Sequence, residues 1–234
     1  MSNYSSSISQ LVNLSLYKTF GWTSIGLFLT SFISYFLSNS IYFFNFFNPT
    51  THSPTLLFIG CFVAQFLIIL SMGFAYRKLN YPSLLLMFLS FASLNGIILS
   101  TIFFTYDLSS ITGVFFIASG MFLFMSFYGL MTKHDLTPIG VGASMILFGM
   151  LIVGFINIFL RSYAISMFSS FIGVLIFSIF TAYDIQNIKK FLSELAYNQS
   201  ERDKLSILGA LQMYQNFINL FLNLLRLLGH RKRN

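Results

Sequence analysis

The sequence predicts an all-α integral membrane protein with seven transmembrane helices. Hydrophobic residues make up 56% of the 234 residues and charged residues only 8%, whereas a soluble domain carries about 25% charged residues. The apolar residues also gather in long runs of about 20, the length that a helix needs to cross the hydrocarbon core of a bilayer. Short polar segments, which hold most of the Lys and Arg, separate these runs.

Seven apolar runs define the expected organisation of the chain. They cover residues 20–37, 55–76, 82–105, 108–131, 140–160, 164–184 and 205–228. We expect residues 1–17 to form a polar tail without regular structure, residues 18–229 a single transmembrane domain, and residues 230–234 a basic tail. No small-residue cleavage site follows the first run, so this run is expected to remain as the first span.

The segments between the runs carry signals that are typical of helix ends. Residues 38–54 hold no Lys or Arg, and their aromatic stretch is too short to cross a bilayer, so an interfacial loop is expected there. Pro82 opens the third run, where a missing backbone N–H does no harm. Asp107 stands directly before the fourth run, where its side chain is expected to cap the first turn. A loop over residues 132–138 and a charged segment over residues 186–204 precede the fifth and seventh runs.

The distribution of Lys and Arg predicts the orientation, because these residues are enriched in cytoplasmic loops. With the N-terminus in the cytoplasm, the outer loops hold only Arg161. The inner loops then hold Lys18, Arg77, Lys78, Lys133, Lys189, Lys190, Arg202 and Lys204. The basic residues after His230 oppose this arrangement, since seven complete crossings place them outside. We prefer a full seventh crossing, and the alternative is a last helix that does not cross completely.

The last run differs from the others because it carries carboxamides. Gln212, Asn216, Asn219 and Asn223 follow one another at steps of four, three and four residues, which places them on one face of an α-helix. An amide without a partner in hydrocarbon costs about 4–8 kcal/mol, so this face is expected to avoid lipid. Two interpretations remain: a polar seam that holds the helix in a bundle, or the lining of a path for an ion.

Asp184 is the acidic residue that falls within a predicted membrane span, close to Thr181, which we expect to line an ion path or the polar seam together with the carboxamides. One interpretation is an interfacial acid that stays hydrated. The other is an acid turned into the bundle, toward the carboxamides of the last run. Burial then favours its neutral form and amide donors favour its ionised form, so a carboxyl balanced in this way responds to pH. An acid inside the membrane is also a candidate functional group.

Other kinds of chemistry find little support in the sequence. His52, His134 and His230 are scattered and Cys61 stands alone in an apolar run, so we expect neither a metal site nor a disulfide. No pair of nucleophile and base lies at membrane depth and no phosphate-binding loop is visible, so we expect no enzyme and no cofactor. The net charge of +7 comes from loops and the tail, which indicates membrane orientation and not nucleic-acid binding.

Several short motifs carry a more specific signal. The strongest is the run FTAYDIQ at residues 180–186, and the last helix adds Tyr214 with the runs FINLF and LLR at residues 217–221 and 224–226. Further matches are the run GWTSIG at residues 21–26, and Tyr128-Gly129 followed by Thr132-Lys133 and Asp135-Leu136. Together these motifs resemble the Bax inhibitor-1 family, in its bacterial branch, over nearly the whole chain.

The resemblance implies a bundle in the bacterial inner membrane, with six helices around a central seventh. It also implies a pH-sensitive calcium leak in which two aspartates, one on each of the last two helices, share a proton. The first aspartate maps onto Asp184, whereas the second position holds Asn216. Two carboxylates at close range resist double ionisation, but an amide does not titrate, so the pH response is expected to be shifted or weakened. The basic partner of the family maps onto Lys78 or Arg77.

Two hypotheses about function follow. The first is a passive, cation-permeable protein that is gated at Asp184. The second is a non-transporting interaction protein that modulates a membrane protease or other membrane machinery, with the N-terminal tail as its contact region. The lost acid at position 216 weakens the first hypothesis relative to the second.

Overall fold

The computed structural model describes residues 2–47 and 54–232, with side chains from residue 8 onward. Within these residues every regular element is a helix, which confirms the predicted all-α class. The chain divides into two compact units. The first is built from the residues up to Tyr106 together with Leu195–Leu211, and the second from Asp107–Glu194 together with Gln212–Arg231. His52 and the central part of the predicted 38–54 loop lie outside the described residues.

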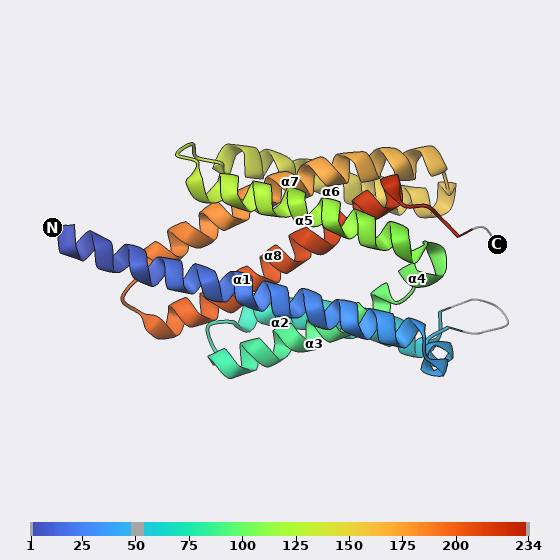
Figure 1. Ribbon diagram of the computed structural model, residues 1–234, viewed down its shortest axis with the longest axis horizontal. Coiled ribbons are helices and arrows are strands. Elements are labelled where there is room, and N and C mark those ends of the chain that lie inside the picture. Colours follow the sequence, from blue (N-terminus) through green and yellow to red (C-terminus); the bar gives the residue numbers. More distant parts are fainter. Residues whose placement is uncertain (1, 48–53, 233–234) are drawn as a thin grey trace. The chain divides into compact units, whose positions relative to one another are not determined.

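The first unit is organised around the packing of one helix, α3, against two others. It contains α1 (Ser2–Ser38), the 3-10 helix η1 (Ile41–Asn45), α2 (Leu56–Ala75), α3 (Tyr81–Leu99), α4 (Ile102–Thr105) and the first part of α8 (Gln199–Leu228). Helix α3 contacts both α1 and α2 (Figure 1). The buried Thr30 hydroxyl on α1 donates to the Ala92 carbonyl on α3 over 2.8 Å, so a hydrogen bond supplements the apolar packing between these helices.

Polar contacts join the first part of α8 to α1. The Ser206 hydroxyl donates to the Ser15 carbonyl over 3.2 Å, and Lys18 and Asp203 form a salt bridge of 2.6 Å. The Arg202 side chain is buried and donates to the Leu11 carbonyl over 3.2 Å. Residues before position 18 therefore take part in the packed structure.

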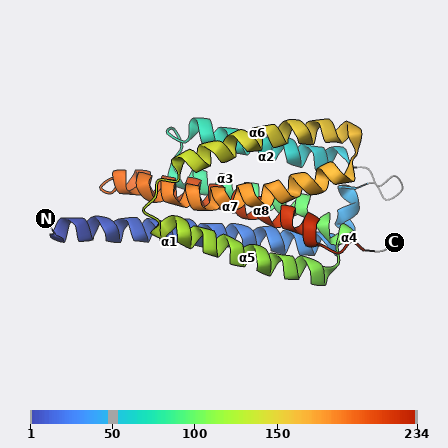
Figure 2. The same ribbon diagram turned by 90° about the horizontal axis from the view of Figure 1, so that it is seen from above.

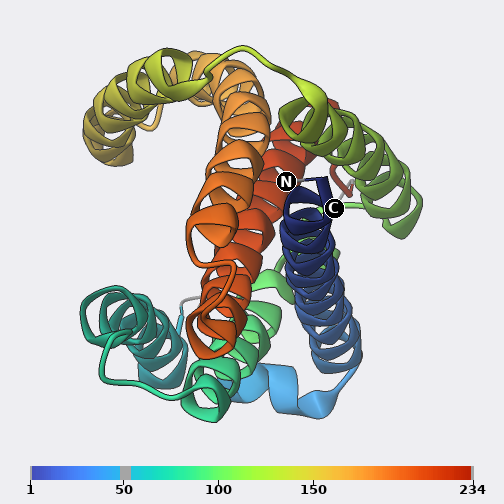
Figure 3. The same ribbon diagram turned by 90° about the vertical axis from the view of Figure 1, so that its left-hand side faces the viewer.

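The second unit places α7 between two other helices. It contains α5 (Leu108–Met131), α6 (Thr137–Leu160), α7 (Tyr163–Glu194) and the second part of α8. Helix α7 contacts both α5 and α6, and it lies between them in the view from above and in the end-on view (Figures 2 and 3). A Cβ on Gly140 of α6 would lie 2.5 Å from the ring of Tyr183 on α7, so this position admits only a glycine at the observed spacing. The contact packs α6 against α7 at the residue that precedes Asp184.

Six helices are long and apolar enough to cross a membrane among the residues that the structure describes. These segments are Ile8–Ser38, Leu56–Ala75, Tyr81–Thr105, Leu108–Met131, Thr137–Leu160 and Tyr163–Glu194. Helix α8 is not one of them, because charged residues at its start and carboxamides along its length lower its hydropathy. The chain is thus a multi-pass membrane protein by helix length and composition, while the seventh span stays a prediction.

The helix boundaries agree with the predicted runs in part. The fourth run is confirmed, since α5 spans Leu108–Met131. The expected N-terminal tail is wrong as unstructured chain, because α1 starts at Ser2 and buries Val12 and Leu16. Asp107 stands at the N-cap of α5, but its side chain makes no capping hydrogen bond, so the expected capping role is also wrong.

Two further boundaries differ from the prediction for identifiable reasons. The third run is split between α3 and α4, where the Ser100 and Thr101 hydroxyls donate to the carbonyls of the preceding turn and compete with helix continuation. Helix α7 runs ten residues beyond Asp184, to Glu194. Buried Ile188 and Leu192 continue an apolar stripe at helical spacing there, so the charged segment remains amphipathic helix.

Candidate functional site

The candidate site joins one acid of α7 to one amide of α8 within the second unit. The Asn216 side-chain Nδ2 donates to Asp184 Oδ2 over 2.7 Å. Asn216 is 6% exposed and Asp184 is half-buried. The prediction that the acid turns toward the carboxamides of the last helix is confirmed for this pair, and the interpretation of a fully hydrated interfacial acid does not fit the contact.

The chemistry of this pair is that of an acceptor and a donor, not of two acids. A hydrogen bond to an ionised acceptor is short and about twice as strong as a neutral one, which fits the 2.7 Å separation. A carboxamide donates two N–H groups but does not gain or lose a proton by titration near neutral pH. Among the residues of the second unit, no Lys or Arg forms a salt bridge with Asp184. Asn216 therefore holds the carboxylate in place without sharing its proton.

The other carboxamides of α8 are placed unequally. Asn219 and Asn223 are half-buried, and Asn223 Nδ2 donates to the Asn219 carbonyl over 2.8 Å. The Asn223 carboxamide packs on α7, since a Cβ on Gly173 would lie 2.6 Å from its Oδ1. Gln212 is exposed. The expectation that this face avoids lipid allows contact with water, so it stays a prediction at this residue. The next residue, Met213, is fully buried.

Thr181 takes a structural position in α7. Its side chain is fully buried, and its hydroxyl donates to the Phe177 carbonyl one turn earlier, over 2.7 Å. This bond satisfies the hydroxyl within its own helix. The place of Thr181 in an ion path or in the polar seam stays a prediction.

The two candidate basic partners lie in the first unit. Arg77 and Lys78 follow the last residue of α2, and the Arg77 guanidinium lies 6.0 Å from the ring centroid of its neighbour Tyr76. Asp184 belongs to the second unit. Their partnership with Asp184 stays a prediction.

Gln186 is a positioning residue to which the sequence assigned no role. Its Oε1 accepts from the Leu136 backbone N–H over 2.9 Å, and its Nε2 donates to the His134 carbonyl over 2.8 Å. The two bonds fasten the connection between α5 and α6 to α7, two residues from Asp184. A carboxamide at the polar end of a membrane helix is the only local sign of this clamp, and its partners are 50 and 52 residues away.

The described residues offer no grouping of three or more His, Cys, Asp or Glu side chains that could hold a metal ion. The acid–amide pair itself contains one carboxylate, that of Asp184.

Comparison with known proteins places these features in a family. The family model described as "Inhibitor of apoptosis-promoting Bax1" matches residues 12–233. The chain is 35% identical over 216 residues to the inner membrane protein YbhL of Escherichia coli (strain K12), which covers 92% of this chain and 91% of YbhL. A protein of Borreliella burgdorferi is 35% identical over 222 residues, covering 95% of this chain and 94% of its own length. A protein of Rickettsia prowazekii is 40% identical over 161 residues, or 69% and 67% of the two chains.

Proposed function

Because this chain belongs to the Bax inhibitor-1 family of multi-pass membrane proteins, we propose that it is a passive cation leak, for calcium or another cation, centred on Asp184. The proposal includes a pH response that is weakened by Asn216. The observation that carries it is the 2.7 Å hydrogen bond from Asn216 to Asp184. The proposal involves no catalytic step and no cofactor.

The physical argument concerns the number of protons that the site exchanges. In a pair of aspartates, ionisation of one carboxyl makes ionisation of the second harder, because like charges at close range repel. Such a pair keeps a shared proton over a wide range of pH. With Asn216 in the second position, the amide stabilises the ionised form of Asp184 and only one group titrates. A gate that opens or closes on loss of a shared proton is therefore less sensitive to pH in this chain.

The proposed architecture is the one that the family resemblance implies. Seven helices cross the inner membrane of a bacterium, the N-terminus lies in the cytoplasm, and α8 stands at the centre of the bundle. Two observations support it: YbhL is an inner membrane protein of Escherichia coli, and α8 carries fully buried Met213, Tyr214 and Leu220. Reporters fused to each terminus test the orientation. A cytoplasmic signal from both ends contradicts a complete seventh crossing.

The decisive experiment measures calcium and monovalent cation flux through the purified protein in liposomes at two pH values. We expect flux in the wild type and an altered flux in Asp184→Asn, with both proteins equally folded by circular dichroism. Absence of flux in the wild type at both pH values refutes the leak. A variant that only lowers expression assigns Asp184 a structural role.

The second candidate function is an interaction protein that modulates a membrane protease or other membrane machinery without transport. Leu14 and Tyr17 are the proposed contact residues, because these large apolar side chains of α1 are 53% and 74% exposed. They lie in the first part of the membrane-length segment Ile8–Ser38, before the predicted run 20–37. This function predicts a partner that co-purifies with the protein and is lost in the variant Leu14→Ser/Tyr17→Ser. It also predicts no flux in liposomes.

A further inference from the structure

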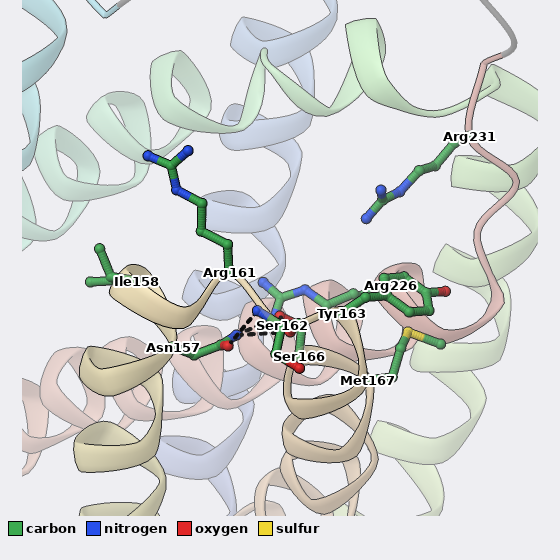
Figure 4. A pocket seen from close by; sticks show the side chains of 9 residues that line it. All are labelled: Asn157, Ile158, Arg161, Ser162, Tyr163, Ser166, Met167, Arg226 and Arg231. Carbon is green, nitrogen blue, oxygen red and sulfur yellow. Dashed lines mark hydrogen bonds between the residues drawn. The ribbon is translucent and has the colours of Figure 1, made fainter.

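A basic recess lies in the second unit, away from the acid–amide pair. Its volume is about 430 Å³, within the range of about 300–1,000 Å³ that is usual for small-molecule sites. Three arginines line it, and they come from separate segments: Arg161 from the junction of α6 and α7, Arg226 from the last turn of α8, and Arg231 from the residues after α8 (Figure 4). The fold thus brings together three cations from distant parts of the chain.

Among the residues that the structure describes, none of these three guanidinium groups forms a salt bridge with an acidic side chain. The salt bridges of the described residues join Lys18 to Asp203 and Lys204 to Glu201. Asp107 is near in the chain path, since its backbone N–H donates to the His230 carbonyl over 3.2 Å, but its carboxylate forms no salt bridge with the recess. Within the described part of the chain, the one side-chain hydrogen bond of the three joins Arg226 Nη1 to the Ser170 hydroxyl over 3.3 Å. The described residues thus leave most N–H donors of the recess available to an anion.

The wall of the recess is fixed by a hydrogen-bonded turn. Asn157 Oδ1 accepts from the Ser162 N–H over 2.9 Å, and its Nδ2 donates to the Ser166 hydroxyl over 2.8 Å. This turn holds Arg161 at φ 49° and ψ 32°, a left-handed conformation that is unfavourable for a residue with a Cβ. The structure therefore presents an arginine at a position where a glycine would be relaxed, in an orientation set by its neighbours.

The chemistry of the lining selects a phosphate group. The planar guanidinium fork matches two phosphate oxygens at once, and such charge-assisted pairs are strong. The recess also lies where two membrane-length helices meet, and its rim includes the exposed apolar side chains Ile158 and Tyr163. Basic pockets between membrane helices bind the headgroups of anionic lipids. We propose that this recess binds a phosphate group, supplied by the headgroup of an anionic lipid whose glycerol and acyl region contacts the apolar rim.

The test uses the full-length protein and measures lipid binding, so its result is independent of any flux. Native mass spectrometry and thermal unfolding follow titration with phosphatidylglycerol, with phosphatidylcholine, or with inorganic phosphate against chloride at equal ionic strength. The variants are Arg226→Gln and Arg161→Lys, the second of which keeps the charge but removes the fork. Lys133→Gln is the matched control, because Lys133 is an exposed cation outside the recess.

We expect the wild type to bind phosphatidylglycerol in preference to phosphatidylcholine. Arg226→Gln should weaken that binding about tenfold, the effect of losing one charge-assisted hydrogen bond, Arg161→Lys should weaken it by less, and Lys133→Gln should leave it unchanged. Inorganic phosphate that binds as tightly as the lipid, and is lost in the same variants, supports the phosphate site and assigns free phosphate as its source. Equal binding of both lipids, or equal losses in Arg226→Gln and Lys133→Gln with all variants folded, overturns the proposal.

Discussion

The substitution Asn216→Asp tests the central argument, because it restores the second acid of the pair with almost no change in shape. The present donor and acceptor are 2.7 Å apart, so two carboxylates in these positions would lie within about 4 Å, where like charges at an effective dielectric constant of 20 repel by about 4 kcal/mol. Since one pH unit corresponds to about 1.36 kcal/mol, the repulsion amounts to about 3 pH units. The pH at which flux changes should therefore move upward by up to ~3 units relative to the wild type.

The assay is the pH profile of cation flux in liposomes for the wild type, Asn216→Asp and the double variant Asp184→Asn/Asn216→Asp. The single variant should show the upward shift, and the double variant should lose it, because only one carboxyl remains and there is no repulsion. Superimposed profiles for the wild type and Asn216→Asp refute the reasoning, provided that both proteins conduct and unfold at the same temperature. A shift that persists in the double variant refutes it as well, since the shift then arises without the pair.

Three further predictions concern stability and are read from unfolding in detergent. Gln186→Leu leaves two backbone groups of the α5–α6 connection without their side-chain partners and should lower the free energy of unfolding by about 1–3 kcal/mol. The control Gln212→Leu, at an exposed position, should change it by no more than about 0.5 kcal/mol. Equal effects of the two variants contradict the clamp. Gly173→Ala places a Cβ against the carboxamide of Asn223 on α8 and should lower the free energy of unfolding by about 1–3 kcal/mol. The control Gly154→Ala, with no atom within 4 Å of its added Cβ, should be neutral or slightly stabilising. A neutral Gly173→Ala shows that the helices are not packed as described. Hydrogen bonds from the Thr137 side chain and backbone N–H lower the pKa of Asp135, so its contribution to stability is present above the ordinary aspartate range and lost as the pH falls through the lowered pKa. Asp135→Asn should remove this part of the acid sensitivity, and an unchanged pH profile of stability argues against it.

Local sequence patterns predicted the helices well wherever one side of the boundary was clearly polar. The span at residues 108–131 agrees with α5 residue for residue. They failed at both ends of the charged segment before α8. Helix α7 continues to Glu194 through an amphipathic stripe at Ile188 and Leu192 that was hidden by the lysines between them, and α8 begins at Gln199, before the predicted run. They also failed at the N-terminus, where serine-rich sequence resembles a tail until a partner helix buries Val12 and Leu16.

The candidate site was predicted in chemistry but not in geometry. The step pattern of the carboxamides indicated one polar face, and Asn216 does meet Asp184. The pattern did not reveal that Gln212 is exposed, because helical spacing places residues on one face without saying where along the helix that face is covered. Nor did it assign Gln186 a role, because its two backbone partners become neighbours only when α5, α6 and α7 pack together.

Composition and periodicity by themselves determined that this chain is helical and membrane-spanning and that one acid falls within a predicted span, because these properties follow from local transfer free energies and helix repeats. Only the tertiary structure decided which groups meet that acid, which carboxamides are buried, and which recess three arginines from separate segments line together. Those outcomes depend on contacts between residues far apart in the chain, and such contacts form only when whole helices find their partners.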